Sequence, residues 1–255
     1  ATNSYNVGVG YFAGAGITTG VENTLIGGLA GDAITTAYYN TALGKDALST
    51  NTLSSLNVAI GHSALKTLSA GGSETHNVAV GASAGQSVTT GVDNTLIGGL
   101  AGDALTDADS NVAVGRQALS SDTLGSRSTA IGNNALFTQN FTTATNSYNT
   151  AVGYEAGLLI TTGIQNTLIG GLAGDALTDA DFNVALGYSA LGAATTSDGN
   201  TAIGRFALLS DTQGNLNVAV GRDALRAQNF TTDVDAYNVA VGGLAGTAVT
   251  TGIKN

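Results

Sequence analysis

The chain has 255 residues, of which 37 are glycine, and it contains no proline, cysteine, methionine or tryptophan. Eight lysine and arginine residues stand against 18 aspartate and glutamate residues, and the net charge of −10 argues against a nucleic-acid partner, because phosphate backbones are bound by basic patches. Without cysteine the chain can form neither disulfides nor thiolate metal sites, and because no apolar run is long enough to cross a bilayer we expect no membrane insertion.

A nine-residue motif, N-[VT]-[A/L]-[V/I/L]-G-x-x-A-[L/G], recurs throughout the chain. Successive copies start 17 residues apart, except for three longer steps of 20 or 21 residues. Repeats of this kind indicate a solenoid, in which each copy forms one structural unit. The fourteen copies start at Asn6, Asn23, Asn40, Asn57, Asn77, Asn94, Asn111, Ser128, Asn149, Asn166, Asn183, Asn200, Asn217 and Asn238.

Each motif predicts one short β-strand followed by a corner. Positions 2 (Val or Thr) and 4 (Val, Ile or Leu) share one strand face, which we expect to point into the core. Position 3, which is Ala or Leu in thirteen copies, lies on the opposite face, so we expect the strand to be buried on both faces. The invariant glycine at position 5 suits a corner that no side chain fits. Seventeen residues are too few for a strand-helix-strand unit. The sequence therefore predicts an all-β fold, a parallel β-solenoid of about fifteen 17-residue coils.

The asparagine at position 1 is expected to stack from coil to coil and to hydrogen-bond through its amide. Proline would remove a donor from these ladders, which explains its absence. The apolar second face, at Leu25, Ala42 and Ala59, needs a partner in this interpretation. We therefore predict self-association along the solenoid, as a homotrimer.

A slower repeat is superimposed on the 17-residue period, because NTLIGGLAGDA occurs at Asn23, Asn94 and Asn166. The sequence of residues 1–6, ATNSYN, recurs at residues 144–149. Both ends of the chain thus fall within the pattern. We expect residues 1–255 to be a single repeat domain that is a segment of a longer fibre.

Several copies resemble the repeats of known fibre proteins. NTAVGYEAG, NVALGYSAL, NTAIGRFAL and NVAVGRDAL resemble the N-T-A-x-G-x-x-A-L repeats of bacteriophage tail fibres. They are more distantly similar to the S-V-A-I-G repeats in the head domains of trimeric autotransporter adhesins. The resemblance covers essentially the whole chain. It implies a parallel β-roll, usually trimeric, that displays receptor-binding surfaces on a virion or a cell surface.

Three segments contain the longer steps, 66–76, 137–148 and 226–237, and we expect them to project as loops from one edge. The second and third share the sequence QNFTT. Exposed aromatic and amide side chains stack on sugar rings and hydrogen-bond to them, which predicts contact with a cell-surface glycan or receptor. In the alternative interpretation, the aromatic residues pack each loop onto the solenoid. The predicted contact residues are Phe137, Gln139, Asn140, Phe141, Tyr148, Gln228, Asn229, Phe230 and Tyr237.

Two acidic turns share the sequence GDALTDAD. Three carboxylates within seven residues can bind Ca²⁺ together with backbone carbonyls, and the alternative is a solvated turn. We expect no other cofactor. The candidate calcium ligands are Asp103, Asp107, Asp109, Asp175, Asp179 and Asp181.

Other functions fit the sequence poorly. His62 and His76 are the two histidines and no Ser-His-Asp set recurs, so we do not expect an enzyme. Residues 8–13 match a dinucleotide fingerprint only formally, since no strand-helix-strand unit follows. Ice binding would require a threonine array on every coil, whereas pairs such as Thr18 and Thr19 occur once per slower repeat. We predict an extracellular fibre or adhesin segment that serves as a rigid shaft or head. The alternative is a subunit of a filament that stacks end to end.

Overall fold

The structure, a computed structural model, describes residues 4–255. It is all-β and forms a parallel β-solenoid, which confirms the predicted fold class. No helix occurs among the described residues, and hence none that is long and apolar enough to cross a membrane. The chain divides into two compact units: residues up to Arg127 with Thr142–Thr145, and Ser128–Phe141 with Asn146–Asn255. A solenoid can be divided between any two turns, so the single repeat domain stays a prediction.

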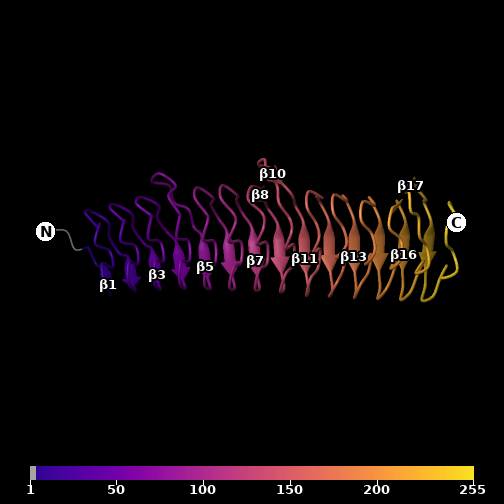
Figure 1. The fold of residues 1–255 in the computed structure, drawn as a ribbon, viewed down its shortest axis with the longest axis horizontal. Coiled ribbons are helices and arrows are strands. Elements are labelled where there is room, and N and C mark those ends of the chain that lie inside the picture. Colours follow the sequence, from indigo (N-terminus) through magenta and orange to yellow (C-terminus); the bar gives the residue numbers. More distant parts are fainter. Residues whose placement is uncertain (1–3) are drawn as a thin grey trace. The chain divides into compact units, whose positions relative to one another are not determined.

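The first unit contains seven strands of three residues, stacked in chain order (Figure 1). Each strand pairs in parallel with the next, and equivalent motif positions are opposite each other, as Thr24 is to Thr41. The register is therefore set by the repeat. The strands are β1 (Val7–Val9), β2 (Thr24–Ile26), β3 (Thr41–Leu43), β4 (Val58–Ile60), β5 (Val78–Val80), β6 (Thr95–Ile97) and β7 (Val112–Val114).

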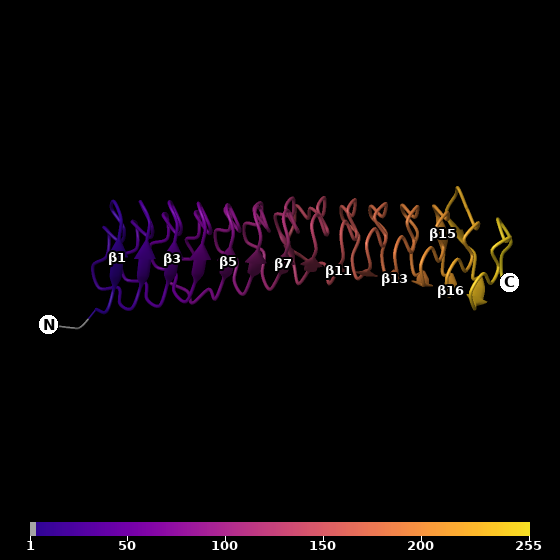
Figure 2. The ribbon, with the colours of Figure 1, turned by 90° about the horizontal axis from the view of Figure 1, so that it is seen from below.

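The second unit repeats this arrangement with seven further strands, whose turns also follow one another in chain order (Figure 2). They are β9 (Thr129–Ile131), β11 (Thr150–Val152), β12 (Thr167–Ile169), β13 (Val184–Leu186), β14 (Thr201–Ile203), β16 (Val218–Val220) and β18 (Val239–Val241). Four strands of two residues lie in the connecting segments, namely β8 (Gly125–Ser126), β10 (Thr145–Asn146), β15 (Gly214–Asn215) and β17 (Val234–Asp235). Fourteen turns result, close to the predicted number, and Asn255 begins a further one by hydrogen bonding to Asn238.

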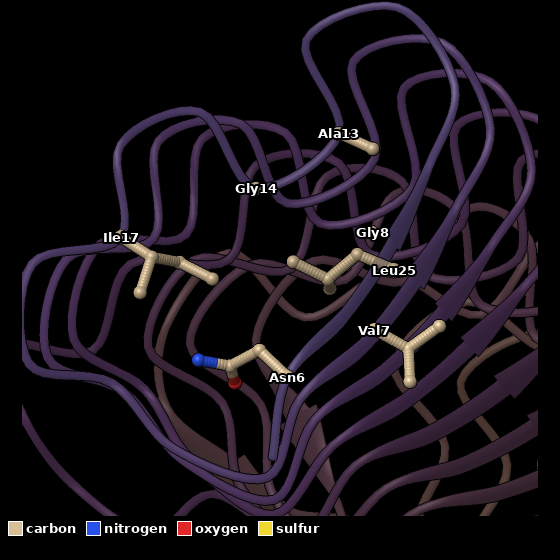
Figure 3. A pocket seen from close by; sticks show the side chains of 7 residues that line it. All are labelled: Asn6, Val7, Gly8, Ala13, Gly14, Ile17 and Leu25. Atoms are coloured by element: carbon tan, nitrogen blue, oxygen red, sulfur yellow. The ribbon is translucent and has the colours of Figure 1, made fainter. Parts of the chain in front are cut away.

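The predicted orientation of the strand faces is wrong. Position 3 is the inward position: Leu25, Ala42 and Ala59 are at most 1% exposed. Positions 2 and 4 point outward and are half-buried or exposed. Figure 3 shows the alternation in the first two turns, where Leu25 of the second turn extends into the interior and Val7 of the first turn points away from it. The physical reason is the small volume of the interior. A 17-residue turn encloses a narrow space that suits Ala at position 3, and the Thr, Val, Ile and Leu side chains of positions 2 and 4 lie on the outside.

The core is filled by complementary large and small residues. Every turn with Leu at position 3 has Gly at position 9, and Leu occurs at position 9 only where position 3 is Ala. A Cβ on Gly102 would lie 2.7 Å from the Leu96 side chain and 2.8 Å from that of Leu105. Leu96 thus occupies the space that Leu48 fills in another turn. Exchanges of this kind conserve core volume, which is the change that cores tolerate best.

The predicted asparagine ladder is present, and its asparagines from Asn23 to Asn238 are buried. The side-chain oxygen of Asn149 accepts hydrogen bonds from the backbone N–H of Asn166 (2.9 Å) and from its amide (3.3 Å). The amide of Asn166 also donates to the carbonyl of Ala180, across the same turn, at 2.8 Å. Each asparagine therefore joins two turns and also closes its own. Buried polar groups must be hydrogen-bonded in this way, because water cannot reach them.

The glycine at position 5 forms the predicted corner. Gly27 has φ = +136°, and a Cβ there would lie 2.5 Å from the carbonyl oxygen of Gly44 in the next turn. Only glycine combines this backbone conformation with so close a contact. A Cβ on Gly28, the next residue, would have no atom within 4 Å. The corner therefore requires glycine at position 5 and leaves room for a side chain at position 6.

Candidate functional site

Four of the predicted receptor contacts are buried, which corrects the sequence interpretation. Gln139 and Gln228 are fully buried, and Phe141 and Phe230 are 5% and 6% exposed. Side chains so covered cannot reach a receptor. The alternative interpretation, that aromatic residues pack the segment onto the solenoid, describes both phenylalanines.

The two glutamines hydrogen-bond to the asparagine ladder in the wider turns. Gln139 donates to the hydroxyl of Ser128 at 2.8 Å and accepts from the amide of Asn149 at 2.9 Å. Ser128 is the copy that lacks asparagine at position 1. Gln228 likewise accepts from Asn238 at 2.9 Å, and it donates to Asp211 at 2.5 Å. The repeated QNFTT sequence therefore has a structural role: its glutamine bonds to a ladder asparagine and its phenylalanine is buried.

The remaining predicted contacts lie at the surface. Asn140, Tyr148, Asn229 and Tyr237 are exposed, and Phe137 is half-buried. Tyr148 and Tyr237 each precede the first residue of a motif. They belong to a series that continues in every turn.

The series before each motif is variable in sequence and left-handed in backbone. Its members are exposed or half-buried, and the non-glycine members have φ between 48° and 64°. In contrast to the asparagine beside it, this position takes charged, polar, aromatic and aliphatic residues alike. The series comprises Tyr5, Glu22, Tyr39, Leu56, His76, Asp93, Ser110, Arg127, Tyr148, Gln165, Phe182, Gly199, Leu216, Tyr237 and Lys254.

The long segments are attached to neighbouring turns. In 226–237, β17 pairs with β15, and Asp233 accepts a hydrogen bond from Asn215 at 2.5 Å. In 66–76, Glu74 accepts a hydrogen bond from the Tyr38 hydroxyl at 2.7 Å, which raises the pKa of that tyrosine. The projection of all three segments from one edge stays a prediction.

The acidic turns do not bring three carboxylates together. Within residues 4–255 no group of three or more His, Cys, Asp or Glu side chains is placed to hold a metal ion. Asp109 and Asp181 instead accept backbone N–H groups of the preceding turn, from Val92 at 2.8 Å and Ile164 at 2.7 Å. Three of the other candidates accept hydrogen bonds from hydroxyl groups: Asp103 from Ser120, Asp107 from Thr90 and Asp179 from Thr178. The last candidate, Asp175, is half-buried.

Two of these carboxyl groups titrate above their ordinary range. Burial raises the pKa of Asp175. Burial also raises the pKa of Asp181, helped by the negative charges of Asp198 and Asp179 and opposed by the Ile164 N–H group. Asp181 and Asp198 lie in adjacent turns, and the Asp181 N–H donates to Asp198 at 2.7 Å. The stacked carboxylates thus repel each other while serving as backbone acceptors.

A threonine ladder runs along the turns. The Thr18 hydroxyl donates to the carbonyl of Thr35, and that of Thr35 to Thr52, both at 3.2 Å. The first threonine of each pair, such as Thr18, therefore recurs at 17-residue steps, a pattern that the pairs alone do not reveal. Because these hydroxyl hydrogens are used within the solenoid, the ladder is a structural device.

The outward strand face consists of positions 2 and 4 of every motif, and it carries no charge. All its residues are Thr, Val, Ile or Leu. Leu43 is 44% exposed and Leu186 is 43% exposed. In each unit the face runs across all seven strands. Depletion of charged residues is typical of the centre of a protein interface.

Comparison of the chain with protein-family models, with curated proteins and with solved structures found no match. The function is therefore argued from the geometry of the solenoid and its surfaces.

Proposed function

We propose that the chain is a rigid structural segment of an extracellular fibre or adhesin, a shaft or head that displays contact residues. The observation that carries this proposal is the separation, within each turn, of recurring structural residues from variable surface residues. The recurring residues form the frame, Asn166 in the buried ladder and Gly170 at a corner, while the variable residues lie before the motif and after its glycine, at the surface. Scaffolds that hold variable residues on a rigid frame are typical of binding surfaces.

The same proposal assigns the outward strand face to self-association, with a second copy of this chain as its partner and a homotrimer as the assembly. Because the face repeats at the spacing of the strands, two copies can align turn by turn. In one unit the face extends over seven strands, and Leu43 and Ile97 within it are 44% and 39% exposed, so its apolar side chains are open to a partner. Its lack of charge removes the main cost of desolvation.

Analytical ultracentrifugation with negative-stain electron microscopy tests the assembly. The informative variant is Leu186→Lys, on the outward strand face, which places a charge in the interface. Leu159→Lys is the matched control, because Leu159 is 44% exposed and lies outside the strands. We expect wild type and the control to sediment as discrete trimers and Leu186→Lys to sediment as a monomer.

Two outcomes would contradict this assembly. Wild-type monomers would remove self-association, and long fibres of uniform width would favour the end-to-end filament instead. A glycan array tests the display role separately. Binding to one or more surface glycans is expected, and an array without binders would remove the receptor contact from the proposal.

A further inference from the structure

Three of the eight basic residues of this acidic chain lie together in the second unit. Arg205 and Arg222 occupy motif position 6 in adjacent turns, 17 residues apart, and Arg226 follows in the same turn as Arg222. All three side chains are exposed. Three arginines and the carboxylate of Asp223 give the cluster a charge of +2 (three minus one), against −10 for the chain. The cluster therefore attracts anions to a surface that otherwise repels them.

The Phe206 ring contacts two of the three guanidinium groups. The guanidinium carbon of Arg205 lies 4.2 Å from the centre of the Phe206 ring, and that of Arg226 lies 5.1 Å from it. The ring of Tyr188, from position 6 of the preceding turn, meets Phe206 edge to face at 5.7 Å between centres. Tyr188 is 49% exposed. Contact with a ring orders a guanidinium group but leaves its in-plane N–H donors available.

The charges of the cluster are unevenly paired. Asp223 is buried and bonds to both Arg222 Nε (3.2 Å) and Arg226 Nη1 (3.1 Å). Arg205 forms no ion pair in the part of the chain that the structure describes. Arg222 and Arg226 thus share one carboxylate, and Arg205 has no carboxylate partner among the described residues. A bound anion would supply the missing negative charge.

A hollow adjoins Arg226 and Asp223 of the cluster. It has a volume of about 300 Å³, within the lower range of small-molecule sites. Polar and apolar groups both line it, namely Ser210, Asp223, Arg226, Ala227, Leu244 and Thr247. This volume accommodates one sugar ring.

We propose that Tyr188, Arg205, Phe206, Arg222 and Arg226 form a binding site for an acidic saccharide, a sugar ring that carries a carboxylate or a sulfate. Arginine pairs with such groups through two parallel N–H donors, and the exposed Tyr188 ring provides a face for the sugar. Three arginines on a chain of charge −10 do not make the extended basic track that a nucleic acid requires. The proposal rests on the display role proposed above and names its ligand class.

The site can be tested with three monosaccharides in titrations followed by ligand-observed nuclear magnetic resonance. Galacturonic acid carries a carboxylate and galactose 6-sulfate carries a sulfate, while galactose is neutral. We expect one or both acidic sugars to bind, the stronger one identifying the anionic group, and galactose to bind at least about tenfold more weakly.

Arg205→Gln should weaken binding of the acidic sugar at least about tenfold. The matched control is Arg116→Gln, because Arg116 also occupies motif position 6 and is exposed, but Gly99 and Gln117 occupy the positions that correspond to Tyr188 and Phe206. The control should bind as wild type does. Equal melting temperatures of Arg205→Gln and wild type would show that the loss is local.

The site would be overturned if no acidic sugar bound, if galactose bound equally well, or if Arg205→Gln bound like wild type. The display role has its own readout in the glycan array. Array binding that Arg205→Gln retains would leave the display role standing and remove this site from it.

Discussion

The substitution Asn166→Ala tests the asparagine ladder directly. The Asn166 side chain is fully buried, closes its own turn and joins it to the next: its amide donates to the carbonyl of Ala180 at 2.8 Å, and its oxygen accepts the N–H of Asn183 at 3.0 Å. Alanine removes both partners. The Asn183 N–H and the Ala180 carbonyl are then buried without hydrogen bonds. Each such group costs about 1 to 3 kcal/mol, so the free energy of unfolding should fall by about 4 kcal/mol.

Urea unfolding followed by circular dichroism measures this loss. Gln165→Ala is the matched control, because Gln165 is the neighbouring amide residue and its side chain is exposed. Its free energy of unfolding should change by no more than about 0.5 kcal/mol. Amide hydrogen exchange gives a second readout: protection of the Asn183 N–H should fall in Asn166→Ala and stay unchanged in the control. A loss below about 1 kcal/mol with normal protection at Asn183 would refute the reasoning, because it would mean that the ladder does not stabilise the stack.

Two further predictions concern the core and the stacked carboxylates. Leu96→Ala should cost about 3 kcal/mol through the cavity it leaves, and adding Gly102→Leu should restore much of it, because Ala59, Leu65 and Leu68 already form that arrangement. Urea midpoints of wild type and both variants measure this, and a double variant no more stable than Leu96→Ala would contradict the volume exchange. Asp181→Asn should be as stable as wild type or more stable at pH 7, because the amide oxygen keeps the Ile164 bond and the repulsion from Asp198 and Asp179 disappears. Since the pKa of Asp181 is raised in the folded state, wild type loses stability as the pH rises through that value, so the advantage should vanish near pH 3; an advantage that persists there would reject the electrostatic cause.

The site residues illustrate what repeats reveal and what they hide. Tyr148 and Tyr237 were predicted as surface residues and are exposed, whereas Gln139 and Phe141 were predicted beside them and are buried. All four lie in the same kind of segment, and composition does not distinguish them. The absence of asparagine at Ser128 was the available signal, because a ladder with a missing member needs a substitute acceptor for the amide of the next asparagine. The arginine cluster had a signal too, in the 17-residue spacing of Tyr188, Arg205 and Arg222.

The sequence by itself determined the period, the parallel register, the asparagine ladder and the glycine corner. Each of these follows from one residue type that recurs at one spacing, and stacking equivalent positions needs no further information. Tertiary structure alone decided which strand face points inward. Position 4 is as apolar as position 3, so hydrophobicity alone did not separate the two faces. Volume decided, because the interior of a 17-residue turn takes Ala42 and leaves Leu43 outside, and it takes Leu at position 3 only where position 9 is Gly.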